Sequence, residues 1–235
     1  WWKALFLWFP AVVVTAILVK AINFSADAWP NRIYTQPERL LTEPRILWEY
    51  LYHLYLPRIE GRGLFQDGYQ FSRSFISPSS TFVAWLGLGG LIVAIIKLRI
   101  RLPFLSLALL FFLVGHLIES TVLNLELYFE HRNYMASAFL FLPIAILLVG
   151  LKHKAKLWLS VLGVVLLLTM LSLLTWERSK LWSNTDRLQL YWAASTPESP
   201  RAQNKIGTAL LASGNSIEAI SHMQNTIKMH PQSSF

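Results

Sequence analysis

The sequence predicts an all-α protein, in which a polytopic membrane helix bundle of about five spans is followed by a smaller soluble helical part. Three observations predict this class. The chain of 235 residues is 54% hydrophobic and only 14% charged, with a mean hydropathy of +0.43, whereas soluble domains carry roughly 25% charged residues. Five long apolar segments alternate with polar loops. After Trp176 the composition becomes that of a soluble protein.

Five segments are long enough to cross a bilayer, which requires about 20 mainly apolar residues. They are residues 4–22, 82–98, 103–120, 134–151 and 157–176. Buried helices of a large soluble protein are the alternative, but they would leave almost no amphipathic surface to face water. The sequence therefore predicts an integral membrane domain over residues 1–176.

Basic residues indicate the orientation of these spans. The loops 97–101 and 152–156 each carry three Lys or Arg and no acidic residue, which places both in the cytoplasm by the positive-inside rule. The loops 24–80 and 119–134 and the C-terminus are then outside. The net charge of +8 is mostly this orientation signal, so nucleic acid is not a predicted partner.

The outer loop 24–80 contains a predicted amphipathic helix at 45–57, which Pro57 ends. Apolar and aromatic residues follow one another there at helical spacing, namely Ile46, Leu47, Tyr50, Leu51, Leu54 and Tyr55. Such a helix suits the outer interface, with its rings at headgroup depth. A helix packed on other extramembrane protein is the alternative.

Residues 199–231 fit the tetratricopeptide pattern of two short antiparallel helices. The matching positions are Gln203, Ile206, Gly207, Leu210, Ala219, Met223 and Pro231. Gly207 and Ala219 are small where the two helices would cross, and Gly214 allows the turn between them. We therefore predict that residues 177–235 begin an extracytoplasmic tetratricopeptide-repeat domain.

Residues 179–199 resemble the second half of a preceding degenerate repeat, or a capping helix. One repeat cannot bury its own apolar face, and about three are usually needed. We therefore expect further repeats beyond Phe235.

The densest polar cluster is "EHRNY", residues 130–134, between the third and fourth predicted spans. Arg132 suits a bidentate clamp for phosphate or carboxylate. Glu130 can orient Arg132 or act as a base, His131 titrates near neutral pH, and Tyr134 offers a hydroxyl at headgroup depth. The alternative is a solvated hairpin, in which Arg132 snorkels or pairs with Glu130.

Two further candidates precede this cluster. Glu119 ends the third predicted span, and His116 lies inside it, where ionisable groups usually face a bundle interior or a cavity. A hydrogen-bonded packing role for His116 is equally open. The chain has no cysteine, and its histidines lack metal-ligand spacing; a divalent metal is possible, but no site is seen. Walker, Rossmann and nucleophile-elbow motifs are also lacking.

Together these features resemble one family, the transmembrane and tetratricopeptide-repeat O-mannosyltransferases and their bacterial relatives. Residues 40–69 are similar to a loop of that family, and the matching residues are Thr42, Arg45, Tyr50, Leu51, Pro57 and Asp67. "YFEHRNYMAS", residues 128–137, resembles the family signature Glu-Arg-x-x-Tyr-x-Pro-Ser. Arg132 comes one position later than the signature Arg, and Ala136 replaces the Pro.

The resemblance implies a GT-C-like bundle in a bacterial inner membrane. It would transfer sugar from a polyprenyl-phosphate donor to protein Ser or Thr outside the cytoplasm, with the repeats engaging the acceptor and no firm cofactor besides the donor. The catalytic acid would lie upstream of Trp1, so this chain is expected to lack the N-terminal catalytic half and to be inactive alone. Donor-binding candidates are Glu130, His131, Arg132, Tyr134, Glu119 and His116, with Arg45 and Asp67 as outer-loop candidates.

Two other functions compete with this hypothesis. One is a non-catalytic, membrane-anchored tetratricopeptide scaffold that binds envelope proteins. The other is a polysaccharide polymerase or ligase of the outer leaflet, which would use an outer-loop Arg but would not need protein-binding repeats.

Overall fold

The computed structural model describes all residues except 31, 58–67, 152–156, 198 and 230–235. The described residues form ten α-helices and no strand, so the predicted all-α class is confirmed. They divide into two compact units, one of residues 1–55 and 70–155 and the other of residues 56–69 and 156–235.

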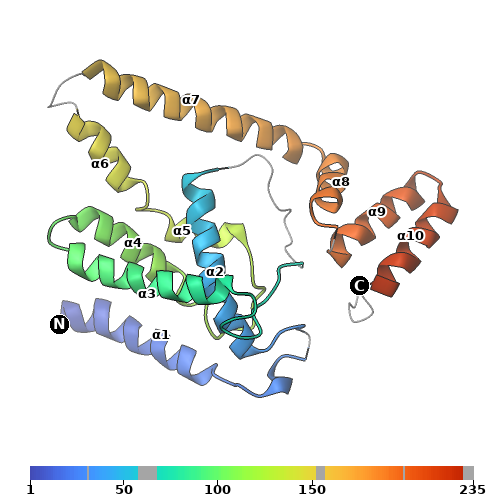
Figure 1. Ribbon diagram of the computed structural model, residues 1–235, viewed down its shortest axis with the longest axis horizontal. Helices are drawn as coiled ribbons and strands as arrows, with labels where there is room; N and C mark the ends of the chain where they lie inside the picture. Colours follow the sequence, from blue (N-terminus) through green and yellow to red (C-terminus); the bar gives the residue numbers. More distant parts are fainter. Residues whose placement is uncertain (31, 58–67, 152–156, 198, 230–235) are drawn as a thin grey trace. The chain divides into compact units, whose positions relative to one another are not determined.

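The first unit contains six of the helices (Figure 1). They are α1 (Phe9–Lys20), α2 (Gln36–Tyr55), α3 (Ser80–Leu98), α4 (Pro103–Gly115), α5 (Asn133–Ala136) and α6 (Leu142–Leu151). A π-helical turn, Ala4–Trp8, precedes α1, and short 3-10 helices occupy Ala26–Ala28 and Glu130–Arg132. Helix α3 contacts both α2 and α4.

Helix α2 begins nine residues before the predicted start at residue 45 and ends at Tyr55. Its start is a capping box, which the sequence "TQPE" contains: the Glu38 carboxylate accepts from the Thr35 N–H at 2.8 Å and from the Thr35 hydroxyl at 2.9 Å. These bonds satisfy groups that a helix start leaves unpaired. The additional residues of α2 include the buried polar side chains of Gln36, Arg39 and Glu43, which contribute to the candidate site.

Two described helices are long and apolar enough to cross a membrane, Ser80–Leu98 and Trp158–Trp182. Five spans were predicted, and only two of them coincide with helices of sufficient length among the described residues. Ala4–Lys20 and Pro103–Gly115 are apolar but shorter. The predicted span 134–151 is divided between α5 and α6.

The two shortened spans have physical causes. Pro143 has no N–H to donate to a continuing helix, so α6 starts afresh with this proline in its first turn. After α4, the carbonyls of Glu119 and Thr121 accept from Arg39 of α2 at 2.6 and 3.1 Å. The chain after His116 is thereby drawn onto α2.

The second unit contains α7 (Leu157–Trp182), α8 (Thr185–Ser195), α9 (Pro200–Ala212) and α10 (Ser216–Met229). Helix α7 continues past Trp176, where the predicted membrane domain ends. Side-chain caps start the next two helices: the Asn184 side chain accepts from the Arg187 N–H at 2.9 Å, and the Ser199 hydroxyl accepts from the Ala202 N–H at 3.2 Å.

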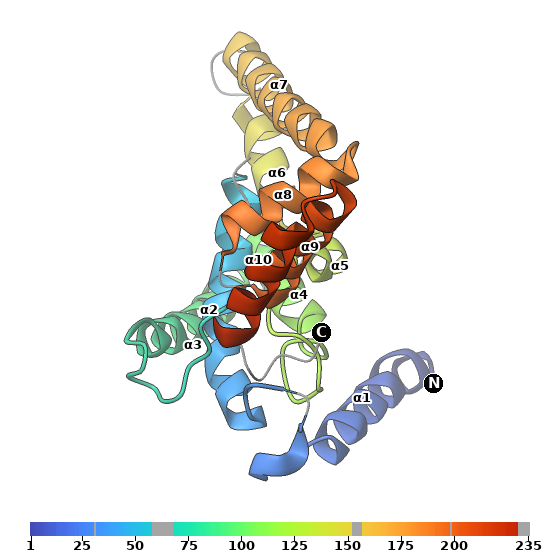
Figure 2. The same cartoon turned by 90° about the vertical axis from the view of Figure 1, so that its right-hand side faces the viewer.

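Helices α9 and α10 form an antiparallel pair, which Figures 1 and 2 show in the red part of the chain. A Cβ atom at Gly207 would lie 2.7 Å from Met223 Cγ, so any larger residue here would require the Met223 side chain to shift. Gly214 makes the turn with a φ of 84°, a conformation that glycine adopts without strain. Ala219 is fully buried and Leu210 half-buried. Pro231 lies outside the described residues.

Candidate functional site

Arg39 of α2 is the centre of a buried polar network in the first unit. Its side chain is fully buried, and its guanidinium donates to four backbone carbonyls of the segment that follows α4. The acceptors are Glu119 at 2.6 Å, Thr121 at 3.1 Å, Leu125, and Glu126 at 3.2 Å. Because a guanidinium has five N–H donors in a rigid fork, this network holds the segment 119–126 in one conformation.

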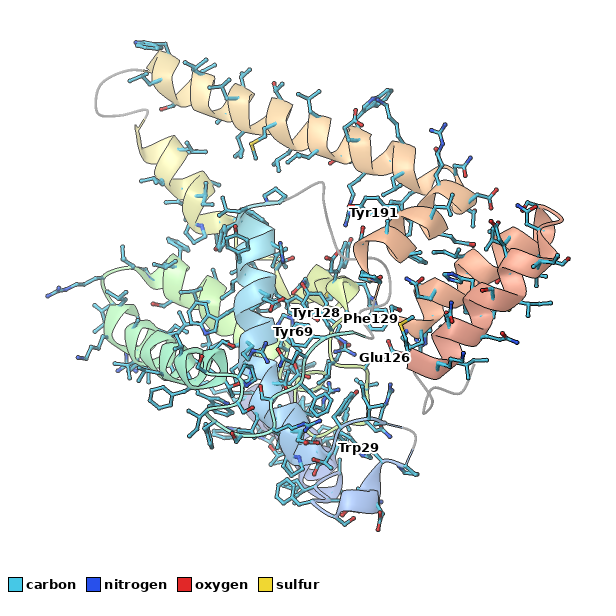
Figure 3. All side chains as sticks on the ribbon, turned by 45° about the vertical axis from the view of Figure 1, so that its right-hand side comes forward. Trp29, Tyr69, Glu126, Tyr128, Phe129 and Tyr191 are labelled. Carbon is cyan, nitrogen blue, oxygen red and sulfur yellow. The ribbon has the colours of Figure 1, made fainter. Side chains whose placement is uncertain are left out.

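Tyr50 holds the next part of that segment. Its hydroxyl accepts from the Phe129 N–H at 2.7 Å and donates to the Phe129 carbonyl at 3.0 Å. Its ring also packs on the ring of Tyr128, with centroids 4.8 Å apart; Figure 3 labels Tyr128 and Phe129 beside α2. The chain is thus fixed on α2 immediately before "EHRNY".

Arg132 is held in place by this fixed segment. Its side chain is 5% exposed, its Nη1 donates to the Leu127 carbonyl at 3.1 Å, and its guanidinium lies 5.6 Å from the centroid of the Phe129 ring. Its Nε lies 3.4 Å from Oε2 of Glu119. Two separately predicted candidates, Arg132 and Glu119, are therefore brought together, with the arginine side chain buried and the acid at the surface, whereas the partner considered for Arg132 from the sequence was Glu130.

Glu43 lies one helical turn after Arg39 and is 2% exposed. Its Oε1 is 2.8 Å from Arg39 Nη2. Burial raises the pKa of Glu43 to about 7, although the charges of Arg39 and Arg132 and the Ser120 hydroxyl act in the opposite direction. Among the described residues, no well-aligned hydrogen bond reaches either carboxylate oxygen. Glu43 can therefore exchange a proton near neutral pH.

His116 is buried as a packing residue between aromatic rings. Its ring centroid is 4.4 Å from that of Phe112 and 5.5 Å from that of Tyr50, and its Nδ1 is 2.9 Å from the Phe112 carbonyl. Asn133, the fourth residue of "EHRNY", is buried nearby and interacts with His116. The side chain of His116 thus lies inside the unit, next to the site.

The other predicted residues of "EHRNY" lie at the surface. Glu130 and His131 are exposed, and Tyr134 is 85% exposed. The His131 ring packs on Phe129 at 4.6 Å. A turn of 3-10 helix over Glu130–Arg132 directs Arg132 inward and its two predecessors outward.

The outer-loop candidates lie apart from Arg132. Arg45 donates to the Gln70 carbonyl at 2.8 Å and lies 3.2 Å from the Ser72 hydroxyl. These two contacts fasten the segment before α3 to α2. Asp67 is outside the described residues.

Sequence reasoning missed Arg39 and Glu43. The capping box at Thr35 could have extended the predicted helix back to residue 36, and the spacing of four would then have placed both charges on one face. Their partners could not have been found in this way, because the carbonyls of 119–126 are about 80 residues further along the chain.

Within the described ranges, no three His, Asp or Glu side chains are grouped closely enough to hold a metal ion. Comparisons with protein-family models, with curated proteins and with solved structures find no match for this chain. The groups at the site offer two kinds of chemistry: a guanidinium held in place for an anion, and a buried carboxyl whose pKa of about 7 lies near neutral pH.

Proposed function

We propose that this chain is part of a membrane glycosyltransferase that takes a sugar from a polyprenyl-phosphate donor and delivers it to protein Ser or Thr hydroxyls outside the cytoplasm. The observation that carries this proposal is Arg132. A guanidinium that is fixed from two sides, in the segment between the apolar helices α4 and α6, suits a phosphate at the membrane surface. The family resemblance of "EHRNY" supports the same function.

The five apolar segments all cross the membrane in this proposal, with "EHRNY" and the repeats on the outer side. The two long apolar helices, α3 and α7, expose most of their side chains, which suits contact with lipid. A 17-residue helix such as Ala4–Lys20 is about 25 Å long, close to the roughly 30 Å of bilayer hydrocarbon. The protein would then be integral to a bacterial inner membrane.

The described residues supply donor binding in this proposal. When the sugar is transferred, negative charge develops on the leaving phosphate, and Arg132 would stabilise it there. The base that activates the acceptor hydroxyl is not assigned to any described residue. Helices α9 and α10 would begin the repeat surface that presents the acceptor protein.

Sugar transfer by the complete protein in proteoliposomes tests the proposal, with a labelled polyprenyl-phosphate sugar and extracytoplasmic peptides as substrates. We expect Arg132→Ala to lower transfer by about 100-fold, or ~2.7 kcal/mol at ~1.36 kcal/mol per decade. Arg32→Ala is the matched control, because Arg32 lies 3.9 Å from Glu126 of the same segment but is more exposed, at 25%. Equal activity of both variants would remove Arg132 from the donor site.

A membrane-anchored tetratricopeptide scaffold is the second candidate function. It is favoured by the exposed isoleucines of α10, because Ile217, Ile220 and Ile227 are 88%, 54% and 56% exposed and suit contact with another protein. In this case no donor would support transfer, and Arg132→Ala would leave the capture of envelope proteins unchanged.

A further inference from the structure

The ion pair between Arg132 and Glu119 is asymmetric. The Arg132 side chain is 5% exposed, whereas that of Glu119 is 46% exposed. Their closest atoms, Nε and Oε2, are 3.4 Å apart, longer than the ~2.7–2.9 Å of a strong charge-assisted hydrogen bond. A pair of this length with a half-exposed carboxylate is weaker than a fully buried ion pair, so the carboxylate can be replaced as long as another anion takes its place beside the buried arginine.

The two partners also differ in their freedom to move. The Leu127 carbonyl and the Phe129 ring hold the guanidinium of Arg132 from two sides. Apart from the pair with Arg132, the contact that holds Glu119 among the described residues is made by its backbone, whose carbonyl accepts from Arg39 Nη2 at 2.6 Å. The Glu119 side chain can therefore rotate into solvent while the backbone and Arg132 stay in place.

We propose that Glu119 is an exchangeable counter-ion, whose carboxylate leaves Arg132 when a phosphate group of a lipid-linked ligand arrives. This inference rests on the proposed function and specifies how its donor site is occupied. A polyprenyl-phosphate sugar is a phosphodiester with one negative charge, which equals the charge of the carboxylate that it replaces. The exchange thus leaves the net charge beside Arg132 unchanged and avoids an unpaired buried arginine at any stage.

Exchange also gives Glu119 a role in specificity. Any anion must compete with a carboxylate that is attached to the same segment and returns without diffusion. A weakly bound anion would lose this competition, whereas a ligand that also inserts a polyprenyl chain into the membrane gains binding energy from its apolar surface. Because the competition weakens the binding of every anion by the same factor, Glu119 would leave free phosphate unbound at low concentrations at which the lipid-linked phosphate still binds.

Binding of a labelled short-chain polyprenyl-phosphate sugar, the phosphodiester of the proposal, to the complete protein in nanodiscs tests the inference. We expect Glu119→Gln to tighten binding by about tenfold, because the competing carboxylate is gone while the backbone contact with Arg39 remains. Glu126→Gln is the matched control: it removes the same charge from the same segment, but that carboxylate lies 3.9 Å from Arg32. We expect it to change binding by less than about twofold.

Arg132→Gln should abolish binding in both the wild-type and the Glu119→Gln backgrounds. Inorganic phosphate provides the second arm: it should compete weakly with the labelled lipid on wild-type protein and more strongly on Glu119→Gln. Thermal unfolding of each variant establishes that it is folded before its binding is compared.

Two outcomes would overturn the inference and are distinguishable. If wild type binds the lipid through Arg132 but Glu119→Gln binds no more tightly, or Glu126→Gln gives the same gain, the exchange is wrong and the donor site stands. If neither wild type nor Glu119→Gln binds, or if binding is indifferent to Arg132→Gln, the donor site itself is wrong and the exchange fails with it.

Discussion

The two units use opposite means to fix their chains. In the first unit the largest fully buried side chain among the described residues is Arg39, and charged and polar groups of α2 bind backbone carbonyls far away in sequence. In the second unit the close contact of α9 and α10 depends on Gly207, which has no side chain. Hydrogen bonds from α2 determine the conformation of the irregular segment 119–126, whereas the lack of a side chain at Gly207 determines how closely α9 and α10 approach.

Of the substitutions that test this contrast, loss of the Arg39 side chain should lower the free energy of unfolding the most. Arg39→Met would leave the carbonyls of 119–126 without their donor and Glu43 buried beside no cation. We expect a loss of about 3–5 kcal/mol in the free energy of unfolding, measured by thermal unfolding in detergent. Arg45→Met, on the same helix but less buried, should cost about 1 kcal/mol. Equal losses would mean that the Arg39 network contributes no more than an ordinary hydrogen bond.

The pH dependence of stability should reveal the buried carboxyl of the first unit. The pKa of Glu43 is raised from 4.5 to about 7 in the folded protein, so the folded state holds this proton more tightly than the unfolded chain does. The stability that results is complete below pH 4.5 and is lost as the pH rises through 7.

As the pH rises from 4.5 to 8, the free energy of unfolding of wild type should therefore fall by about 3 kcal/mol because of this group. Glu43→Gln lacks the titrating group and should not show this fall. Unfolding free energies of wild type and Glu43→Gln, measured across this range, give the difference directly. Parallel pH profiles of the two proteins would show that Glu43 titrates normally. The second unit offers no buried carboxylate among its described residues, so its stability should change less with pH.

Gly115→Ala tests steric fit within the first unit. A Cβ atom there would lie 2.9 Å from Ala136 Cβ and 3.0 Å from Ala136 Cα. Because Cα belongs to the backbone, α4 and α5 would have to move apart, and we expect a loss of about 2 kcal/mol. Since α5 directly follows Arg132, ligand binding should weaken as well. Unchanged stability and unchanged binding of polyprenyl phosphate would show that α5 is free to shift.

Gly207→Ala should have the smallest effect, although its steric conflict is closer. The atoms at 2.7 and 2.8 Å from the new Cβ are Cγ and Cε of Met223, and methionine can change rotamer. Alanine also favours the helix by up to ~1 kcal/mol over glycine. We expect a net loss below about 1 kcal/mol in the free energy of unfolding, measured by thermal unfolding. Because residues 207 and 223 are in contact, the loss in the double variant with Met223→Ala should differ from the sum of the two single losses. A larger loss than that of Gly115→Ala would reverse the contrast between the two units.

The same contrast explains what the sequence could predict. Gly207 and Met223 were found because both are positions of the tetratricopeptide pattern, in which the two paired helices lie within about 20 residues of one another. Arg132 was found as a candidate, but its partner Glu119 was not distinguished from Glu130, because the direction of each side chain depends on a 3-10 turn. Arg39 was missed because its acceptors are backbone groups of a distant segment, which have no sequence signature.

The division of the fourth predicted span has a similar origin. Composition alone makes residues 134–151 uniformly apolar, and only Pro143 marks the start of a new helix at Leu142. The start of α2 was readable in principle from Thr35 and Glu38, since a capping box is a local signal.

The long separation between α2 and its partners bears on the order of assembly. Gln36 donates both to the Ala21 carbonyl, 15 positions earlier in the chain, and to the Val122 carbonyl, 86 positions later. The acceptors of Arg39 are 80–87 positions later. A ribosome completes α2 well before these acceptors leave the exit tunnel. Until then Arg39 and Glu43 must remain hydrated, so α2 cannot settle into its final place early. The arrival of residues 119–129 would then lock the first unit in one late step, in which α2 closes over a segment synthesised long after it.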